Sequence, residues 1–131
     1  MASIRIPKRV LVIDDETHVR EIIQTCLEAF AGWRVSSAES AKVGLVMVNA
    51  DPPDAIVLDV TMPEMSGLDF LQALRTNPET QSIPVVLLTA RADLIEPDRL
   101  RRLAVSGGIT KPFDATTLHQ QIAQMLGWEL L

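Results

Sequence analysis

The chain has 131 residues, 47% of them apolar, and a formal net charge of −5. This length predicts one domain with a single core, and the absence of a run of about 18 apolar residues argues against a membrane span. An acidic chain without a long basic run is also a poor candidate for direct nucleic-acid binding. The N-terminal residues lack the features of a signal peptide, and the single cysteine, Cys26, suits a reducing compartment. A cytoplasmic location is therefore expected.

The first part of the sequence alternates between strand and helix patterns. Residues 10–13 form a continuous apolar run, which is typical of a strand covered on both faces of a parallel sheet. Apolar residues then recur at the spacing of one helical face: Val19, Ile22, Ile23, Cys26, Leu27 and Phe30. Gly32 follows as a helix stop. A short strand is predicted at residues 33–35, and a helix at residues 41–50 with Ser40 as its cap.

The alternation continues through the middle of the chain. A third strand is predicted at residues 55–58, and Ser66 caps the helix that follows. Residues 77–78, an Asn-Pro pair, end this helix. The fourth strand is predicted at residues 85–88, where four apolar residues follow a proline.

The last part of the chain completes five strand–helix units. A helix is predicted around residues 97–104, because a proline stands in its first turn. A short, glycine-rich strand follows at residues 107–110, and Asp114 is predicted to cap a last helix that Gly127 ends. The apolar face of this helix is Leu118, Ile122 and Met125. Strict alternation predicts an α/β fold, a doubly wound parallel sheet with helices on both faces.

Polar side chains follow four of the predicted strands. They are Asp14 and Asp15 after the first, Asp59 after the third, Thr89 after the fourth and Lys111 after the fifth. The carboxyl ends of parallel strands meet at one edge, where such sheets bind ligands. Three clustered carboxylates disfavour one another's ionisation, and oxygen ligands of this kind favour Mg²⁺. An aspartate beside a metal and a lysine is suited to accepting a phosphoryl group.

Four sequence motifs resemble those of the receiver domain of bacterial response regulators, a CheY-like domain. They are DD at 14–15, LDVTMP with Asp59, LLTA with Thr89 and KPF with Lys111. The intervals of 44, 30 and 22 residues (59−15, 89−59 and 111−89) suit the family. The resemblance covers residues 1–131, with a core at about 8–127, and implies a flavodoxin-like, five-stranded sheet of order 2-1-3-4-5 with five helices. No output domain is expected within these residues.

The resemblance also implies a role for each site residue. Asp59 would be the phospho-acceptor, and Thr89 and Lys111 would contact the phosphoryl group. The implied Mg²⁺ ligands are the side chains of Asp14, Asp15 and Asp59 and the backbone carbonyl of Thr61. The peptide bond between Lys111 and Pro112 would be cis. Asp15 could also cap the first helix.

The function implied is a phosphorylation-dependent switch of a two-component system or phosphorelay, and not a turnover enzyme. A histidine kinase or phosphotransfer protein would phosphorylate the domain, and a downstream protein or a second copy would bind the fourth helix, fifth strand and fifth helix. Two alternatives stay open. One is a degenerate receiver that acts as a binding scaffold. The other is a phosphohydrolase with an aspartate nucleophile, against which the threonine at position 61 and the lack of a cap insertion argue.

One position departs from the family pattern. Receivers often have an aromatic residue three positions before the KPF lysine, and here that position is Gly108. The usual relay between the threonine and this aromatic ring therefore cannot operate. Either the loop after Thr89 moves, or the glycine leaves room for a partner's side chain.

Several other residues have plainer interpretations. His18 and His119 are predicted to be solvent-exposed, because neither has a ligand partner at metal-binding spacing. Cys26 is predicted to pack in the core. The basic residues within 99–102 are predicted to form a solvated face, with partner docking as the alternative.

Overall fold

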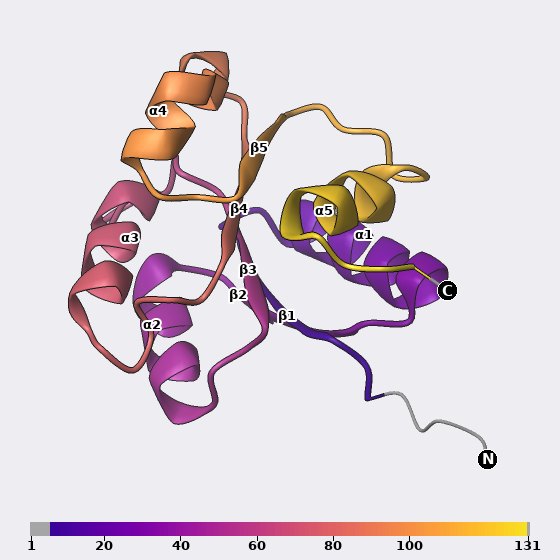
Figure 1. Cartoon of the computed structure of the whole chain (residues 1–131), viewed down its shortest axis with the longest axis horizontal. Coiled ribbons are helices and arrows are strands. Elements are labelled where there is room, and N and C mark those ends of the chain that lie inside the picture. The colour runs from indigo at the N-terminus through magenta and orange to yellow at the C-terminus, as the bar shows by residue number, and fades with distance from the viewer. Residues whose placement is uncertain (1–5, 131) are drawn as a thin grey trace.

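The computed structural model describes residues 6–130, which form one sheet of five parallel strands between two layers of helices (Figure 1). The strands are β1 (Arg9–Ile13), β2 (Arg34–Ala38), β3 (Ala55–Leu58), β4 (Val85–Thr89) and β5 (Gly107–Thr110). The α-helices are α1 (Thr17–Cys26), α2 (Ala41–Ala50), α3 (Gly67–Thr76), α4 (Pro97–Arg102) and α5 (Leu118–Leu126). The π-helical η1 (Leu27–Ala31) extends α1, and the 3₁₀ turn η2 (Ala92–Ile95) precedes α4. The predicted strand order, β2-β1-β3-β4-β5, is confirmed.

Each face of the sheet has its own hydrophobic core. Helices α1 and α5 cover one face, and α2, α3 and α4 cover the other (Figure 1). Successive strand residues point to opposite faces, so Val12 and Val57 pack on the α1–α5 side and Ile13 and Leu58 on the other. This double burial explains the continuous apolar runs in the sequence. No helix among residues 6–130 has the length and hydrophobicity needed to cross a bilayer.

The predicted helix caps and stops are mostly confirmed. The hydroxyl of Ser40 accepts an N–H of the first turn of α2 at 3.1 Å. Ser66 and Asp69 form a reciprocal capping box at the start of α3, with distances of 3.2 and 3.3 Å. Gly32 and Gly127, with φ of 71° and 70°, end η1 and α5 in the left-handed conformation that glycine tolerates best.

The second strand lies further along the chain than predicted. It spans Arg34–Ala38 and not residues 33–35, and Trp33 precedes it. The indole of Trp33 instead packs edge-on against that of Trp128, with ring centroids 5.1 Å apart. Because β2 is an edge strand in which Ser36 is exposed and Ser37 half-buried, its sequence has little of the apolar signal that marks a buried strand.

Two boundaries near the C-terminus also differ from the prediction. Helix α4 ends at Arg102 and not near residue 104, because Ala104 has a φ of 55°. Asp114 does not cap α5, whose N-cap is Thr117. Its carboxylate accepts the N–H of Thr116 at 2.9 Å in the turn that precedes the helix.

The predicted exposure of several helix residues is wrong. Ile22 and Phe30 are 47% and 52% exposed, although they lie on the predicted apolar stripe. The π-helical turn of η1 has more residues per turn than an α-helix. It therefore rotates Phe30 away from the buried face of α1 on which Ile23 lies. The ring of His119, which was expected to be exposed, is buried and stacks on Phe30 with centroids 5.3 Å apart. His18 is exposed as predicted, and the predicted burial of the cysteine at position 26 is confirmed.

Candidate functional site

Four strands deliver the predicted site residues to one edge of the sheet. Strands β1 and β3 are paired, and the N–H of Asp59 donates to the carbonyl of Ile13 at 2.9 Å. Asp59 is therefore held beside the end of β1, where Asp14 and Asp15 follow. Thr89 is the last residue of β4, and β4 pairs with β3 along the edge of β3 that faces away from β1. The topology thus places these residues at one edge, as the sequence predicts.

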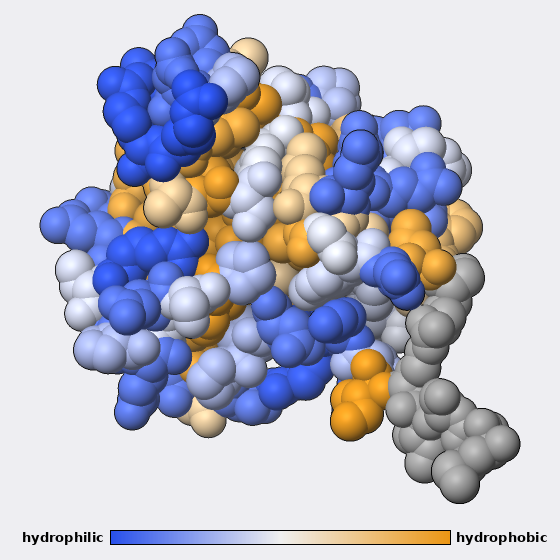
Figure 2. Space-filling model, viewed as in Figure 1, coloured by the Kyte–Doolittle hydropathy of each residue, from blue (hydrophilic) through white to orange (hydrophobic). Residues whose placement is uncertain are grey.

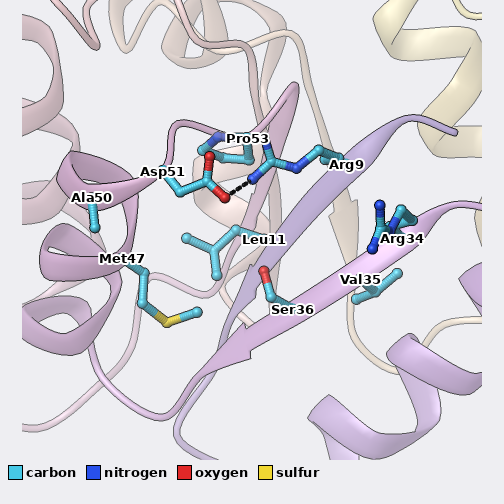
Figure 3. A pocket seen from close by; sticks show the side chains of 9 residues that line it. All are labelled: Arg9, Leu11, Arg34, Val35, Ser36, Met47, Ala50, Asp51 and Pro53. Atoms are coloured by element: carbon cyan, nitrogen blue, oxygen red, sulfur yellow. Dashed lines mark hydrogen bonds and ion pairs between the residues drawn. The ribbon is translucent and has the colours of Figure 1, made fainter. Parts of the chain in front are cut away.

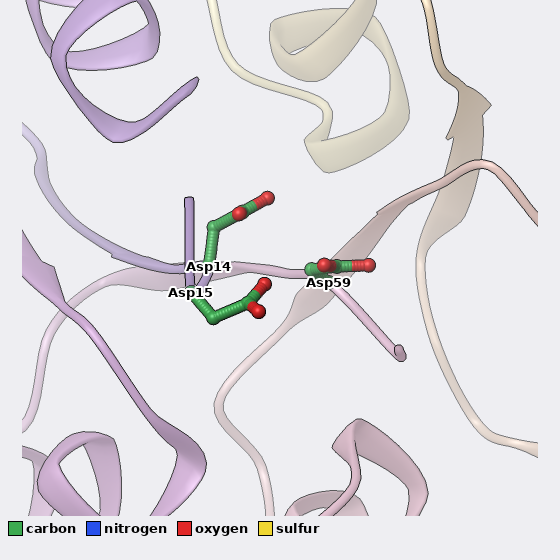
Figure 4. Close-up of side chains that lie close together, drawn as sticks. All are labelled: Asp14, Asp15 and Asp59. Carbon is green, nitrogen blue, oxygen red and sulfur yellow. The ribbon is translucent and has the colours of Figure 1, made fainter. Parts of the chain in front are cut away.

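The three aspartates lie side by side (Figure 4), and one oxygen of each lies within 4.8 Å of the others. Asp14 and Asp59 are buried, with exposed fractions of 1% and 4%, whereas Asp15 is exposed. Three carboxylates so close together repel one another unless cations compensate their charge. Because the donor set is all oxygen and opens to solvent at Asp15, it fits a hard divalent cation such as Mg²⁺.

Lys111 supplies a positive charge to this cluster. Its ammonium nitrogen lies 2.7 Å from Asp14 Oδ2 and 3.5 Å from Asp59 Oδ2. It also lies 3.5 Å from Oε1 of Glu16, a residue that sequence reasoning missed. The only available signal was that Glu16 is a third acid directly after the aspartate pair. The lysine side chain is 15% exposed, so its charge faces the carboxylates more than it faces water.

Burial and charge shift the pKa values of this cluster in ways that matter for chemistry. Burial raises the pKa of Asp59, and the charge of Asp14 adds to this effect, while Lys111 and the N–H of Thr61 oppose it. Burial alone would lower the pKa of Lys111. The hydrogen bond to Asp14 and the surrounding carboxylate charges outweigh burial, so the net shift of the lysine pKa is upward. Lys111 therefore stays protonated and supports the ionised form of Asp59.

The two threonines of the predicted site occupy different environments. Thr89 is fully buried, and its hydroxyl accepts the N–H of Arg91 at 3.1 Å. Thr61 is exposed, and its N–H donates to Asp59 Oδ1 at 3.2 Å. The backbone N–H of Thr61 thus orients the carboxylate of Asp59. The carbonyl of Thr61 takes no part in this hydrogen bond.

Gly67 is a second residue that sequence reasoning missed. It is the first residue of α3, and its N–H donates to the carbonyl of Val60 at 2.9 Å. A Cβ at this position would lie 2.5 Å from the carbonyl oxygen of Asp59 and 2.7 Å from Cα of Val60. Only glycine therefore allows α3 to begin this close to the backbone of Asp59.

The end of β5 confirms one expectation and overturns another. The peptide bond between Lys111 and Pro112 is cis, as the resemblance implied. The hypothesis that Gly108 leaves room for a partner's side chain is wrong for this structure, because Ile95 fills that room. A Cβ on Gly108 would lie 2.5 Å from Ile95 Cδ1.

A separate pocket of about 700 Å³ lies at the opposite, amino-terminal ends of the strands, between β1, β2 and α2 (Figure 3). Arg9 and Arg34 lie at its rim, and the Arg9 guanidinium pairs with the carboxylate of Asp51. None of the predicted site residues lines this pocket. The acid cluster is therefore the site that the sequence motifs form.

Comparisons with known proteins agree with this geometry. Residues 10–123 match the family model of the response regulator receiver domain. The probable transcriptional regulatory protein TcrX of Mycobacterium tuberculosis (strain ATCC 25618 / H37Rv) is 40% identical over 109 residues, which are 82% of this chain but 44% of that protein. The chain thus spans less than half the length of TcrX. The probable chemotaxis protein CheY of Rhizobium etli is 29% identical over 119 residues, 91% of this chain and 92% of that protein.

Solved structures give the same result. The chemotaxis response regulator CheY4 of Vibrio cholerae matches with a TM-score of 0.83 at 26% identity, covering 92% of this chain and 99% of that chain. Residues 10–123, which match the family model, include four strands in full, all of β1 except Arg9, and every aspartate of the acid cluster. We conclude that the chain belongs to the response regulator receiver domains, the phosphorylation-dependent switches of two-component signalling.

Proposed function

We propose that this protein switches state when Asp59 accepts a phosphoryl group from the phosphohistidine of a histidine kinase or phosphotransfer protein. The observation that carries this proposal is the position of the Lys111 ammonium, 2.7 Å from Asp14 and 3.5 Å from Asp59. A structural aspartate at a strand end does not need a partly buried lysine and two further acids around it.

The chemistry follows from the groups around Asp59. A carboxylate oxygen of Asp59 forms a bond to phosphorus while the bond from phosphorus to the donor's imidazole nitrogen breaks, and the electron pair stays on that nitrogen. Lys111 is within reach of the developing phosphoryl charge, and the Thr89 hydroxyl has a proton to donate to a phosphoryl oxygen. Positioning and charge compensation thus supply the rate, and no general acid is required.

We also propose that Asp14, Asp15, Asp59 and the Thr61 carbonyl hold Mg²⁺. The support is the all-oxygen cluster, in which one ligand oxygen of each aspartate lies within 4.8 Å of the other two. When bound, the ion would neutralise the acids and the phosphoryl oxygens. Asp15 is the exposed member, so it would complete the site from the solvent side.

The output is proposed to be a change at the surface formed by α4, β5 and α5, which would then bind a downstream protein or a second copy of the chain. A cytoplasmic location is part of the proposal, because the phosphodonors of such domains act there. The receiver assists its own phosphorylation and dephosphorylation but belongs to a class of signalling proteins and not of conventional enzymes.

The test is phosphorylation followed by intact-mass measurement. Incubation with Mg²⁺ and acetyl phosphate, or with a panel of autophosphorylated histidine kinases, should add the mass of one phosphoryl group. The adduct should be absent from Asp59→Asn and present in Asp98→Asn, which removes an exposed aspartate of α4. It should also be lost when EDTA removes Mg²⁺.

Three results would contradict the proposal. An adduct that survives Asp59→Asn would place the phosphoryl group elsewhere. Failure of every donor to modify the protein would favour the binding scaffold instead. Sustained release of phosphate from generic phosphate esters would favour the phosphohydrolase.

A further inference from the structure

Two successive glycines in β5 let neighbouring elements approach the strand backbone from both faces. A Cβ on Gly107 would lie 2.5 Å from Sδ of Met125 in α5. On the other face, a Cβ on Gly108 would lie 2.5 Å from Ile95 Cδ1 and 3.3 Å from Leu100 Cδ2. The end of the Ile95 side chain therefore rests on bare backbone, in the space where a side chain at position 108 would stand.

Ile95 is connected to the phosphorylation site through one short turn. The hydroxyl of buried Thr89 accepts the N–H of Arg91 at 3.1 Å, and the Arg91 carbonyl accepts the N–H of Leu94 at 3.1 Å. Leu94 is 2% exposed and anchors η2 in the core. Hydrogen bonds and core packing thus connect Thr89 to Ile95, six residues further along the chain, by a contiguous route along which a displacement of Thr89 is expected to reach Ile95.

Helix α4 is weakly attached and so can respond to Ile95. It has six residues, none of them buried. Its apolar contact with the core comes from the partly buried Leu100, and Leu103, which directly follows the helix, packs there as well. The outer side of α4 is strongly hydrophilic, with hydrophobic side chains visible between it and the rest of the domain (Figure 2). Elements with so few buried contacts shift at low free-energy cost.

We infer that Ile95 couples the phosphorylation site to α4 by sliding over the bare backbone of Gly108. When the Thr89 hydroxyl turns to a phosphoryl oxygen on Asp59, the N–H of Arg91 follows it or loses its acceptor. Either change moves η2 and with it Ile95, which shares the space over Gly108 with Leu100. An aliphatic side chain thus serves in place of a rotating aromatic ring. This inference rests on the proposed function of Asp59.

The test measures amide hydrogen exchange of residues 97–102 in the full chain, before and after phosphorylation or binding of beryllium trifluoride with Mg²⁺. In the unsubstituted protein, exchange over α4 should change. In Ile95→Ala, the intact-mass adduct on Asp59 should still form, but the change over α4 should be lost. Ile95→Val removes the methyl group that contacts Gly108 and should reduce the change. If Ile95→Ala is poorly folded, Ile95→Val still tests whether Ile95 couples the phosphorylation site to α4.

A second variant tests the same contact from the other side. Gly108→Ala places a methyl group 2.5 Å from the flexible end of Ile95, which can turn aside without moving backbone. Exchange over α4 should therefore shift without any phosphoryl group, and adding Ile95→Ala should reverse this shift. Ile22→Ala is the control, because it truncates an exposed isoleucine on α1, on the opposite face of the sheet.

The outcomes separate this inference from the proposed function. If Asp59 is phosphorylated and α4 responds equally in Ile95→Ala and in the unsubstituted protein, the coupling role of Ile95 is refuted while the proposed function stands. The same holds if α4 does not respond at all. If Asp59 is never phosphorylated, the proposed function fails and this inference fails with it.

Discussion

Removing the charge of Lys111 tests whether this lysine compensates the acid cluster. We consider Lys111→Met, which keeps most of the side-chain length but leaves the carboxylates of Asp14 and Asp59 without their nearest cation. Both acids are buried, so the loss of a partner leaves charge that water cannot fully solvate.

The magnitude follows from the observed distances. With an effective dielectric constant of about 20, the attraction is about 6 kcal/mol for the 2.7 Å contact with Asp14 and about 5 kcal/mol for the 3.5 Å contact with Asp59. The cost of removing the ions from water offsets much of this gain. Breaking such a buried pair nevertheless typically costs 3–5 kcal/mol, and the partial exposure of Lys111 favours the lower end. We expect Lys111→Met to lower the free energy of unfolding by about 3 kcal/mol at pH 7 without divalent cations.

The difference between the two proteins should depend on pH in a defined way. Because the pKa of Lys111 is raised, its contribution is complete below the usual lysine pKa of about 10.4 and disappears as pH rises through the higher value in the folded protein. On the acidic side, the contribution shrinks as Asp59 takes up a proton, which happens above the usual aspartate pKa because burial raises its own pKa. The stability difference should therefore peak between these two limits.

Urea unfolding followed by far-UV circular dichroism, in EDTA and over a range of pH, measures this difference. Lys42→Met is the control, because Lys42 is an exposed lysine of α2 and should have little effect. Adding Mg²⁺ should stabilise Lys111→Met more than the unsubstituted protein, since its acid cluster has one more uncompensated negative charge. Equal stability of Lys111→Met and Lys42→Met in EDTA at pH 7 would refute the reasoning.

Three further predictions concern the same fold. Asp59→Asn should raise the free energy of unfolding at pH 7 in EDTA, because it replaces a buried ionised carboxylate with a neutral amide. The raised pKa of Asp59 means that its ionised form destabilises the fold, so this gain should vanish below pH of about 3.9; a loss of stability in urea melts at pH 7 would contradict this. Gly67→Ala should cost about 2 kcal/mol because its Cβ meets backbone atoms, and should slow phosphorylation in the intact-mass assay. Gly44→Ala, whose Cβ would meet the end of a side chain 2.6 Å away, should cost less, and an equal cost would argue against the backbone clash. Arg75→Ala should cost about 2 kcal/mol in the same melts, because it removes donors from three backbone carbonyls, whereas exposed Arg102→Ala should be nearly neutral.

The strands, most of the helices and the acid cluster could be predicted from the sequence because their signals are local. Continuous apolar runs mark strands that are buried on both faces, and an alternating order of elements leaves few topologies. Once the sheet is parallel, the residues that follow its strands must share one edge. The positions of Asp14, Asp59 and Lys111 follow from that rule, even though Lys111 and Asp14 are 97 residues apart in the chain.

Other features depended on contacts between distant residues. Glu16 reaches Lys111 only because the start of α1 lies beside the end of β5, and the requirement for glycine at position 67 arises from the backbone of Asp59. His119 is buried by the aromatic ring of Phe30, which a π-helical turn rotates into place. No pattern of residue types along the chain encodes these distances.

The amino-acid sequence alone is enough to predict a doubly wound sheet with three acids, a hydroxyl and an amine at one edge. Hydrophobic periodicity and the strict alternation of strands and helices are sufficient for that conclusion. What fills the space over Gly108 depends on long-range packing, because a residue without a side chain does not specify its neighbour. The packing of η2 and α4 places Ile95 over Gly108, where the Cδ1 methyl group of Ile95 is buried against β5.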